Sequence, residues 1–189
     1  MGQRMFVAIR PPEQVVDELT DFLEPRPGMP WTSPEQWHLT LAFLANVPEH
    51  RTDELVDELA MHVVSHQAFE MRLAGGGVFP HAIGASVLWL GVSNGPAGDG
   101  VTERLSALAT TTRNVANSVG ATPDGKGFVP HLTIARLRRP IEATKWLRIL
   151  DTFTSSPWTV DQIEVIASHL GERKGRRPRY ETLATLRLG

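Results

Sequence analysis

Two short segments of the chain repeat the same order of residue types. Residues 38–42 (His-Leu-Thr-Leu-Ala) and 131–135 (His-Leu-Thr-Ile-Ala) both read His, apolar, Thr, apolar, Ala. The composition gives one His-apolar-Thr-apolar match roughly 0.1 times, so two arise by chance in about one chain in two hundred. An imidazole accepts or donates a proton near neutrality, and a threonine hydroxyl can hydrogen-bond an anionic oxygen. The repeat therefore favours a functional interpretation over two merely solvated strand faces.

Two copies of this pair favour acid–base chemistry on a group held between them. One of His38 and His131 would accept a proton while the other donates one. Thr40 and Thr133 would hydrogen-bond the oxygens of the bound group. A phosphodiester fits, because water attacks phosphorus from one side while an alkoxide leaves from the other. Neither segment contains a His-x-His or His-Glu pair, so we expect neither a metal nor another cofactor.

Both segments lie in runs of alternating apolar and polar residues, which is typical of half-buried β-strands. Because successive side chains of a strand point to opposite faces, the His, Thr and Ala of each segment should share the open face. The apolar residues between them, and Phe43 after the first segment, should face the core. Arg136 follows the second segment, and a regular strand does not place it beside a bound phosphate.

Further strands and helices are expected around the two segments. Helical spacing of apolar residues predicts helices over 15–23, 51–66, 101–119 and 141–153. Alternation predicts strands over 4–10, 69–79, 85–92, 159–170 and 180–188, the first motif strand within 31–47, and a second motif strand into which Pro130 leads. Three consecutive glycines at 75–77 suggest a bulge or loop. This mixture favours an α+β fold with antiparallel sheets over a doubly wound parallel fold.

Composition limits the classes that the chain can belong to. Its 189 residues suffice for one core but are short for two independent domains. A net charge of −2 gives no overall basic field that would indicate nucleic-acid binding. The absence of cysteine excludes disulfides, thiol catalysis and Cys-based zinc sites. The N-terminal apolar run is too short for a signal peptide or a membrane span, so we expect a cytoplasmic protein with no membrane contact.

The chain resembles the 2H phosphoesterase superfamily, which is named for paired His-x-Thr motifs. Within it, the chain is similar to the RNA 2′,3′-cyclic phosphodiesterases, also called 2′-5′ RNA ligases or LigT-like proteins. The segments that carry the resemblance follow the family order along the whole chain. They are residues 5–9, 37–44, 87–91, 126–136 and 179–183.

The resemblance implies one domain over residues 1–189, with two pseudo-symmetric lobes, antiparallel sheets that line a central cleft, and helices outside. It implies that His38 donates and His131 accepts a proton while a terminal 2′,3′-cyclic phosphate opens to a 2′-phosphate. The expected partners are RNA ends or nucleotides with a 2′,3′-cyclic phosphate, bound by a monomer.

Three alternatives stay open. The same site could run the reverse 2′-5′ RNA ligation or hydrolyse a small cyclic nucleotide, or the chain could be an RNA- or nucleotide-binding module without turnover. Two titratable imidazoles argue against the last, because binding alone requires neither.

A basic segment at residues 172–179 places five cations beside one acid in a chain that is otherwise net negative. Its glycine and proline predict a loop between the last two strands, where relatives carry a substrate-facing loop. We expect contacts with RNA phosphates there, and stacking of bases on nearby aromatic rings. For Trp37, beside the first motif, core packing is the preferred interpretation. The candidate RNA-binding residues are Lys126, Phe128, Arg173, Lys174, Arg176, Arg177, Arg179 and Tyr180.

Overall fold

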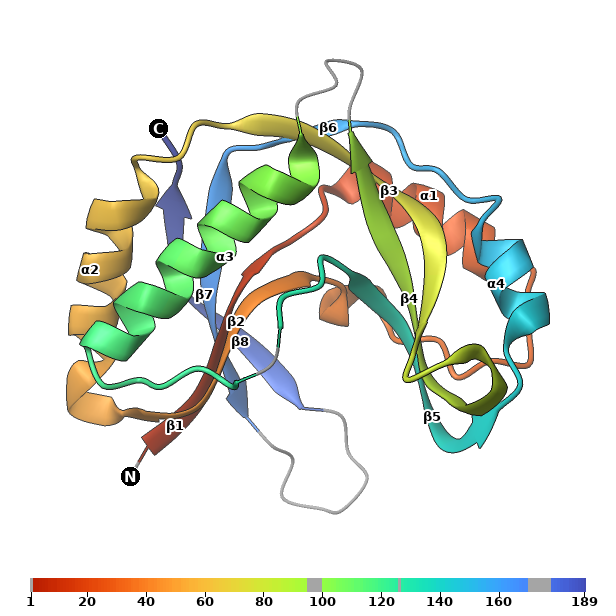
Figure 1. Cartoon of the computed structure of the whole chain (residues 1–189), viewed down its shortest axis with the longest axis horizontal. Coiled ribbons are helices and arrows are strands. Elements are labelled where there is room, and N and C mark those ends of the chain that lie inside the picture. The colour runs from red at the N-terminus through yellow and green to blue at the C-terminus, as the bar shows by residue number, and fades with distance from the viewer. Residues whose placement is uncertain (1, 95–99, 126, 170–177) are drawn as a thin grey trace.

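The computed structural model describes residues 2–94, 100–125, 127–169 and 178–189, which form one curled, fully antiparallel sheet with helices against it (Figure 1). The eight strands lie in the order β6-β3-β4-β5-β2-β1-β7-β8. The α+β prediction with antiparallel pairing is confirmed. The strands are β1 (Gly2–Ile9), β2 (Leu39–Pro48), β3 (Phe69–Phe79), β4 (Ala85–Asn94), β5 (Leu132–Ile141), β6 (Trp158–Val160), β7 (Gln162–His169) and β8 (Arg179–Arg187). The helices are α1 (Glu13–Leu23), α2 (Thr52–Val63), α3 (Val101–Ser118) and α4 (Thr144–Leu150), with short 3-10 helices η1 (Pro34–Gln36), η2 (Glu49–Arg51) and η3 (Ala82–Gly84).

The helices cover the sheet with the apolar stripes that their spacing predicts. In α2, Leu55, Leu59 and Val63 are fully buried at intervals of four residues, and the longer α3 packs beside α2 and against β2. Helix α4 packs against β3 in the other half of the molecule, to the right in Figure 1. None of the helices in the described ranges is both long and apolar enough to cross a membrane.

Two expected elements differ most from the structure. The strand predicted over 159–170 divides at Asp161, because β6 pairs with β3 at one edge of the sheet while β7 pairs with β1 and β8 near the other. The helix predicted over 141–153 shortens to α4, because Ile141 still belongs to β5. The expected bulge is present in β3, where Gly75 adopts a left-handed φ of 81°.

The two motif strands meet at the centre of the sheet. Strands β2 and β5 are joined by the pair Leu39–Leu132, whose antiparallel register aligns His38 with Thr133 and Thr40 with His131. The motifs therefore lie about a local two-fold axis. Whether residues 1–189 form one domain of two pseudo-symmetric lobes stays a prediction.

Each motif strand is also flanked by the segment that leads into the other motif. The amide of Thr32 donates to the carbonyl oxygen of Ile134 at 2.8 Å, and the amide of Asp124 donates to that of Phe43 at 3.1 Å. These two hydrogen bonds are related by the same two-fold axis, one on each side of the central pair. They hold the segment that leads into each motif against the strand of the other motif.

Both motif strands contain a β-bulge directly after the threonine. Ala8 pairs with Thr40 and Val7 with Ala42, so β2 has one extra residue at this point. As a result Ala42 is buried, and the expectation that it shares the open face with the histidine and threonine is wrong. Phe43 moves to that face instead, where it packs beside Phe6.

The bulge in β5 has the same position and the same effect. Trp89 pairs with Thr133 and Leu88 with Ala135, so Ile134 is the extra residue and Ala135 is buried. Arg136 consequently lies on the same face as Thr133, contrary to the expectation from regular alternation.

The central leucine pair should be a strong determinant of stability. Leu39 and Leu132 are 1% and 0% exposed. We expect Leu39→Ala to lower the free energy of unfolding by about 2–5 kcal/mol, through lost burial and the cavity left behind. Leu183→Ala on β8 is the matched control, because Leu183 is 37% exposed and its loss should change the value by less than about 0.5 kcal/mol. Urea unfolding measures both, and equal small effects would contradict the central role of the pair.

Candidate active site

A cleft of about 910 Å³ lies where the two motif strands meet, and all four motif side chains line it. His38 and Thr40 face it from the first motif, and His131 and Thr133 from the second. The open faces that the sequence predicted are therefore turned toward one another. The cleft is also lined by Arg4, Pro30, Thr32, Gln36, Arg136, Arg138, Pro178 and Tyr180.

Both imidazoles are held in the same way. Nδ1 of His38 donates to the carbonyl oxygen of Gln36, and Nδ1 of His131 donates to that of Val129, each at 2.7 Å. A carbonyl oxygen can only accept, so the hydrogen of the neutral ring lies on Nδ1. Nε2 of each ring is therefore the nitrogen left for a bound group, as a base when neutral and as an acid when charged.

Aromatic rings fix the orientation of both imidazoles. His38 stacks on Phe6 with ring centroids 4.5 Å apart, and Tyr180 meets it edge-on at 5.5 Å. His131 lies 5.0 Å from Phe79 and 5.6 Å from Trp89. These walls restrict each ring to one rotamer while its Nδ1 is bonded to the backbone.

Trp89 can take its place behind His131 because Gly77 lies beneath it. A Cβ atom at Gly77 would lie 2.1 Å from the indole ring. Glycine at this position therefore permits the close approach of the tryptophan to the strand.

Burial and nearby positive charge make both histidines weak bases in the ligand-free protein. Burial lowers the pKa of His38 to about 4, and the charges of Arg10 and Arg136 act in the same direction, against the hydrogen bond to Gln36. Burial also lowers the pKa of His131, with a further contribution from Arg136. Without a bound anion, His38 is therefore neutral at pH 7.

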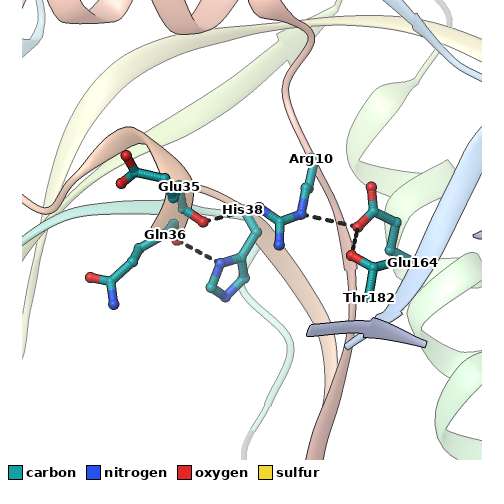
Figure 2. Close-up of polar contacts among 6 residues, drawn as sticks. All are labelled: Arg10, Glu35, Gln36, His38, Glu164 and Thr182. Atoms are coloured by element: carbon teal, nitrogen blue, oxygen red, sulfur yellow. Dashed lines mark hydrogen bonds and ion pairs between the residues drawn. The ribbon is translucent and has the colours of Figure 1, made fainter. Parts of the chain in front are cut away.

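A chain of polar contacts fixes the backbone beside His38 (Figure 2). The hydroxyl of Thr182 and Nε of Arg10 both donate to Oε2 of Glu164, at 2.9 and 3.0 Å. The same guanidinium donates to the carbonyl oxygen of Glu35 at 3.0 Å. Glu35 precedes Gln36 in η1, so the chain supports the carbonyl that holds His38.

The cleft is positively charged. Arg4, Arg136 and Arg138 line it together with no carboxylate, and none of the three forms an ion pair within the described part of the chain. Arg4 lies over the ring of Phe43, 4.6 Å from its centroid. Three guanidinium groups beside two hydroxyls and two imidazoles are suited to an anionic ligand such as a phosphodiester.

The structure describes only part of the predicted RNA-binding set. Tyr180 lines the cleft, whereas Arg179 lies on the opposite side of β8, where it is exposed and 3.8 Å from Glu181. Phe128 is partly buried against the main core. Trp37 is 2% exposed, which confirms its assignment to the core. Lys126, Arg173, Lys174, Arg176 and Arg177 lie outside the described residues.

Several residues of the site carry no signal in the sequence. Arg136 and Arg138 reach the cleft only because of the bulge in β5, and Arg10 meets Glu164 from 154 residues away. Among the described residues, no three His, Asp or Glu side chains lie close enough together to hold a metal ion.

Comparisons with known proteins agree with the geometry. A family model described as "2'-5' RNA ligase superfamily" matches residues 9–172. An RNA 2′,3′-cyclic phosphodiesterase of Thermotoga maritima is 31% identical over 173 residues, which cover 88% of this chain and 87% of that protein. One of Aquifex aeolicus is 32% identical over 143 residues, covering 74% and 73%. The crystal structure of E. coli LigT in its apo form shares the fold, with a TM-score of 0.75, 24% identity, and 99% and 98% of the two chains covered. That of E. coli LigT complexed with 3′-AMP gives a TM-score of 0.76 at 23% identity, covering 100% and 99%.

The lowered pKa of His38 should be visible in the pH dependence of stability. The unfolded chain takes up a proton at this position below about pH 6.5, while the folded protein does so only near pH 4. The contribution of the neutral His38 ring to the free energy of unfolding is therefore fully present above pH 6.5, and it is lost as the pH falls toward 4. We expect the urea midpoint of the wild type to drop more between pH 7 and pH 5 than that of His38→Gln. Equal decreases of the urea midpoint in the wild type and in His38→Gln would show that the folded protein does not hold His38 neutral.

Glu164 should act on His38 without touching the ligand. Glu164→Gln leaves the charge of Arg10 uncompensated, so the pKa of His38 should fall further and η1 should loosen. Thr182→Val is the matched control, because it removes a hydrogen bond to Glu164 but no charge. NMR titration of the His38 ring in both variants measures the effect. An unchanged His38 titration in Glu164→Gln would contradict the positioning role.

Proposed function

Since this chain belongs to the 2′-5′ RNA ligase superfamily, we propose that it opens the 2′,3′-cyclic phosphate at the end of an RNA to leave a 2′-phosphate. The observation that carries the proposal is the pair of imidazoles facing one cleft, each with Nδ1 on a backbone carbonyl and with Nε2 unpaired among the described residues. The relatives with this activity in their names cover most of the chain. A cyclic phosphodiester carries one negative charge, which suits a cleft lined by arginines.

The reaction requires that one proton be removed from the attacking water and that one be donated to the departing oxygen. In the proposed mechanism Nε2 of His131 accepts a proton from water, whose oxygen attacks phosphorus. The bond between phosphorus and O3′ breaks, and Nε2–H of His38 gives its proton to O3′. The hydroxyls of Thr40 and Thr133 donate to the two non-bridging oxygens, where negative charge concentrates during the attack. The assignment of acid and base follows the family resemblance.

The substrate itself helps to supply the charged imidazole. In the free protein burial disfavours the protonated form of His38, and the guanidinium groups add to this effect. A bound phosphate anion offsets the positive charge of the cleft and lies beside Nε2, which stabilises the imidazolium. Phe6 stacks on the same ring and offers its negatively polarised face to a charged imidazole. Binding and activation are therefore coupled.

Ligation through a 2′-5′ bond is the same opening of the cyclic phosphate, with a 5′-hydroxyl in place of water as the nucleophile. We keep hydrolysis as the leading proposal because water is always available to an open cleft, and a small cyclic nucleotide remains an alternative substrate. A cytoplasmic location and a monomeric state stay predictions.

The two histidines should be individually essential. We expect His38→Gln and His131→Gln to lower kcat for an oligonucleotide ending in 2′,3′-cyclic phosphate by about 10²–10⁴-fold each. Chromatography of the products against 2′- and 3′-phosphate standards measures both turnover and direction of opening. Near-normal turnover in either variant, with unchanged circular dichroism, would refute the mechanism.

A second substrate separates the acid from the base. Thymidine 3′-(p-nitrophenyl phosphate) has a leaving group that needs no proton, so His38→Gln should retain far more of its activity on this ester than His131→Gln. The reverse order would exchange the two roles. EDTA is the control for metal dependence, and loss of activity that a divalent ion restores would exclude two-histidine catalysis.

A further inference from the structure

A second basic pocket lies outside the cleft. Arg26, Lys145 and Arg148 line a depression of about 510 Å³ together with Ile149 and Thr152, and no carboxylate lines it. Lys145 and Arg148 are three residues apart on α4, so both project from one face of the helix. We call these three cations the α4 basic pocket.

The cations of the α4 basic pocket are not engaged in ion pairs. None of the three forms an ion pair in the described part of the chain. Arg148 lies near Glu142, whose carboxylate instead accepts hydrogen bonds from Thr144. The guanidinium of Arg26 is fixed in place, over the ring of Phe22 at 4.0 Å and donating to the Phe22 carbonyl oxygen. The pocket therefore offers positive charge in a partly ordered arrangement.

One connector joins this pocket to the cleft. Residues 26–32, in orange in Figure 1, run from the end of α1 past α4 to the motif strands. Trp31 lies edge-on to Trp146 of α4 at 5.4 Å, and its Nε1 donates to the carbonyl oxygen of Arg26. At the other end Pro30 and Thr32 line the cleft. The two positively charged regions thus hold fixed positions relative to each other.

The chemistry of the substrate requires a path by which the rest of the RNA leaves the cleft. A 2′,3′-cyclic phosphate ends the RNA at its 3′ side, so every other nucleotide extends from the 5′ oxygen of the terminal sugar and leaves the cleft. Each of these nucleotides carries a phosphate that a cation can bind. The α4 basic pocket offers three such cations at the end of the connector that lies away from the cleft.

We propose that single-stranded RNA leaves the cleft along residues 26–32 and places a backbone phosphate in the α4 basic pocket. The inference rests on the proposed function, because it takes the 3′ end of the RNA to lie between the two histidines. It assigns to α4 a role in discriminating RNA oligomers from cyclic mononucleotides, which are too short to reach it.

The test removes two charges from α4 and compares ligands of different length. Lys145→Ser/Arg148→Ser should weaken binding of a fluorescent, 3′-phosphorylated RNA 12-mer about 10-fold at low salt, and should lower the salt slope of log K by about 0.7 for each lost phosphate contact. kcat/KM for a cyclic mononucleotide should stay unchanged. Arg51→Ser/Arg187→Ser is the matched control, because it removes two charges that lie on neither pocket.

Each outcome decides the proposal. If the α4 variant binds the 12-mer as tightly as the control does, the proposed path is wrong. If the α4 variant loses as much kcat/KM for the mononucleotide as it loses affinity for the 12-mer, the two cations support the cleft or the fold. The proposal then also fails. The 12-mer is not a substrate, so this comparison needs no turnover. A wild type that binds it through α4 but opens no cyclic phosphate would refute the proposed function alone.

Discussion

The antiparallel pairing of β2 with β5 is the constraint on which the site depends. Register at Leu39 and Leu132 aligns each motif's histidine with the other motif's threonine, and the crossed approach segments at Thr32 and Asp124 hold that register on both sides. A shift of one residue would turn every functional side chain of one strand into the core. The geometry of the candidate site is thus a property of the sheet and not of a loop.

The second organising feature is the choice of a carbonyl as the partner of each imidazole. A carboxylate in that place would raise the pKa of the ring and keep it charged, whereas the carbonyls of Gln36 and Val129 fix the tautomer without adding charge. The burial and arginines around His38 then favour the neutral ring. A bound anion would supply the negative charge that this arrangement lacks. Binding of the ligand and protonation of the imidazole would therefore be linked.

The sequence alone predicted the elements, the antiparallel α+β class and the convergence of the two motifs, because apolar periodicity and a duplicated pattern are local signals. It could not predict the bulges at Leu41 and Ile134, since a register shift is decided by pairing with another strand. The error at Phe43 and Arg136 follows directly from this. Contacts such as Arg10 with Glu164 are equally invisible, because they depend on which distant strands become neighbours.

The paired bulges have a consequence for direction. Five residues after each motif histidine the chain returns to the open face of the sheet, with Phe43 in one half and Arg136 in the other. A strictly symmetric frame would accept a phosphodiester equally well in either of two opposite poses. One flank carries the ring of Phe43 with Arg4 over it, and the other carries Arg136, so the two poses are unequal. In the proposed mechanism, these flanking residues would help to decide which imidazole meets the nucleophile and which meets the departing oxygen.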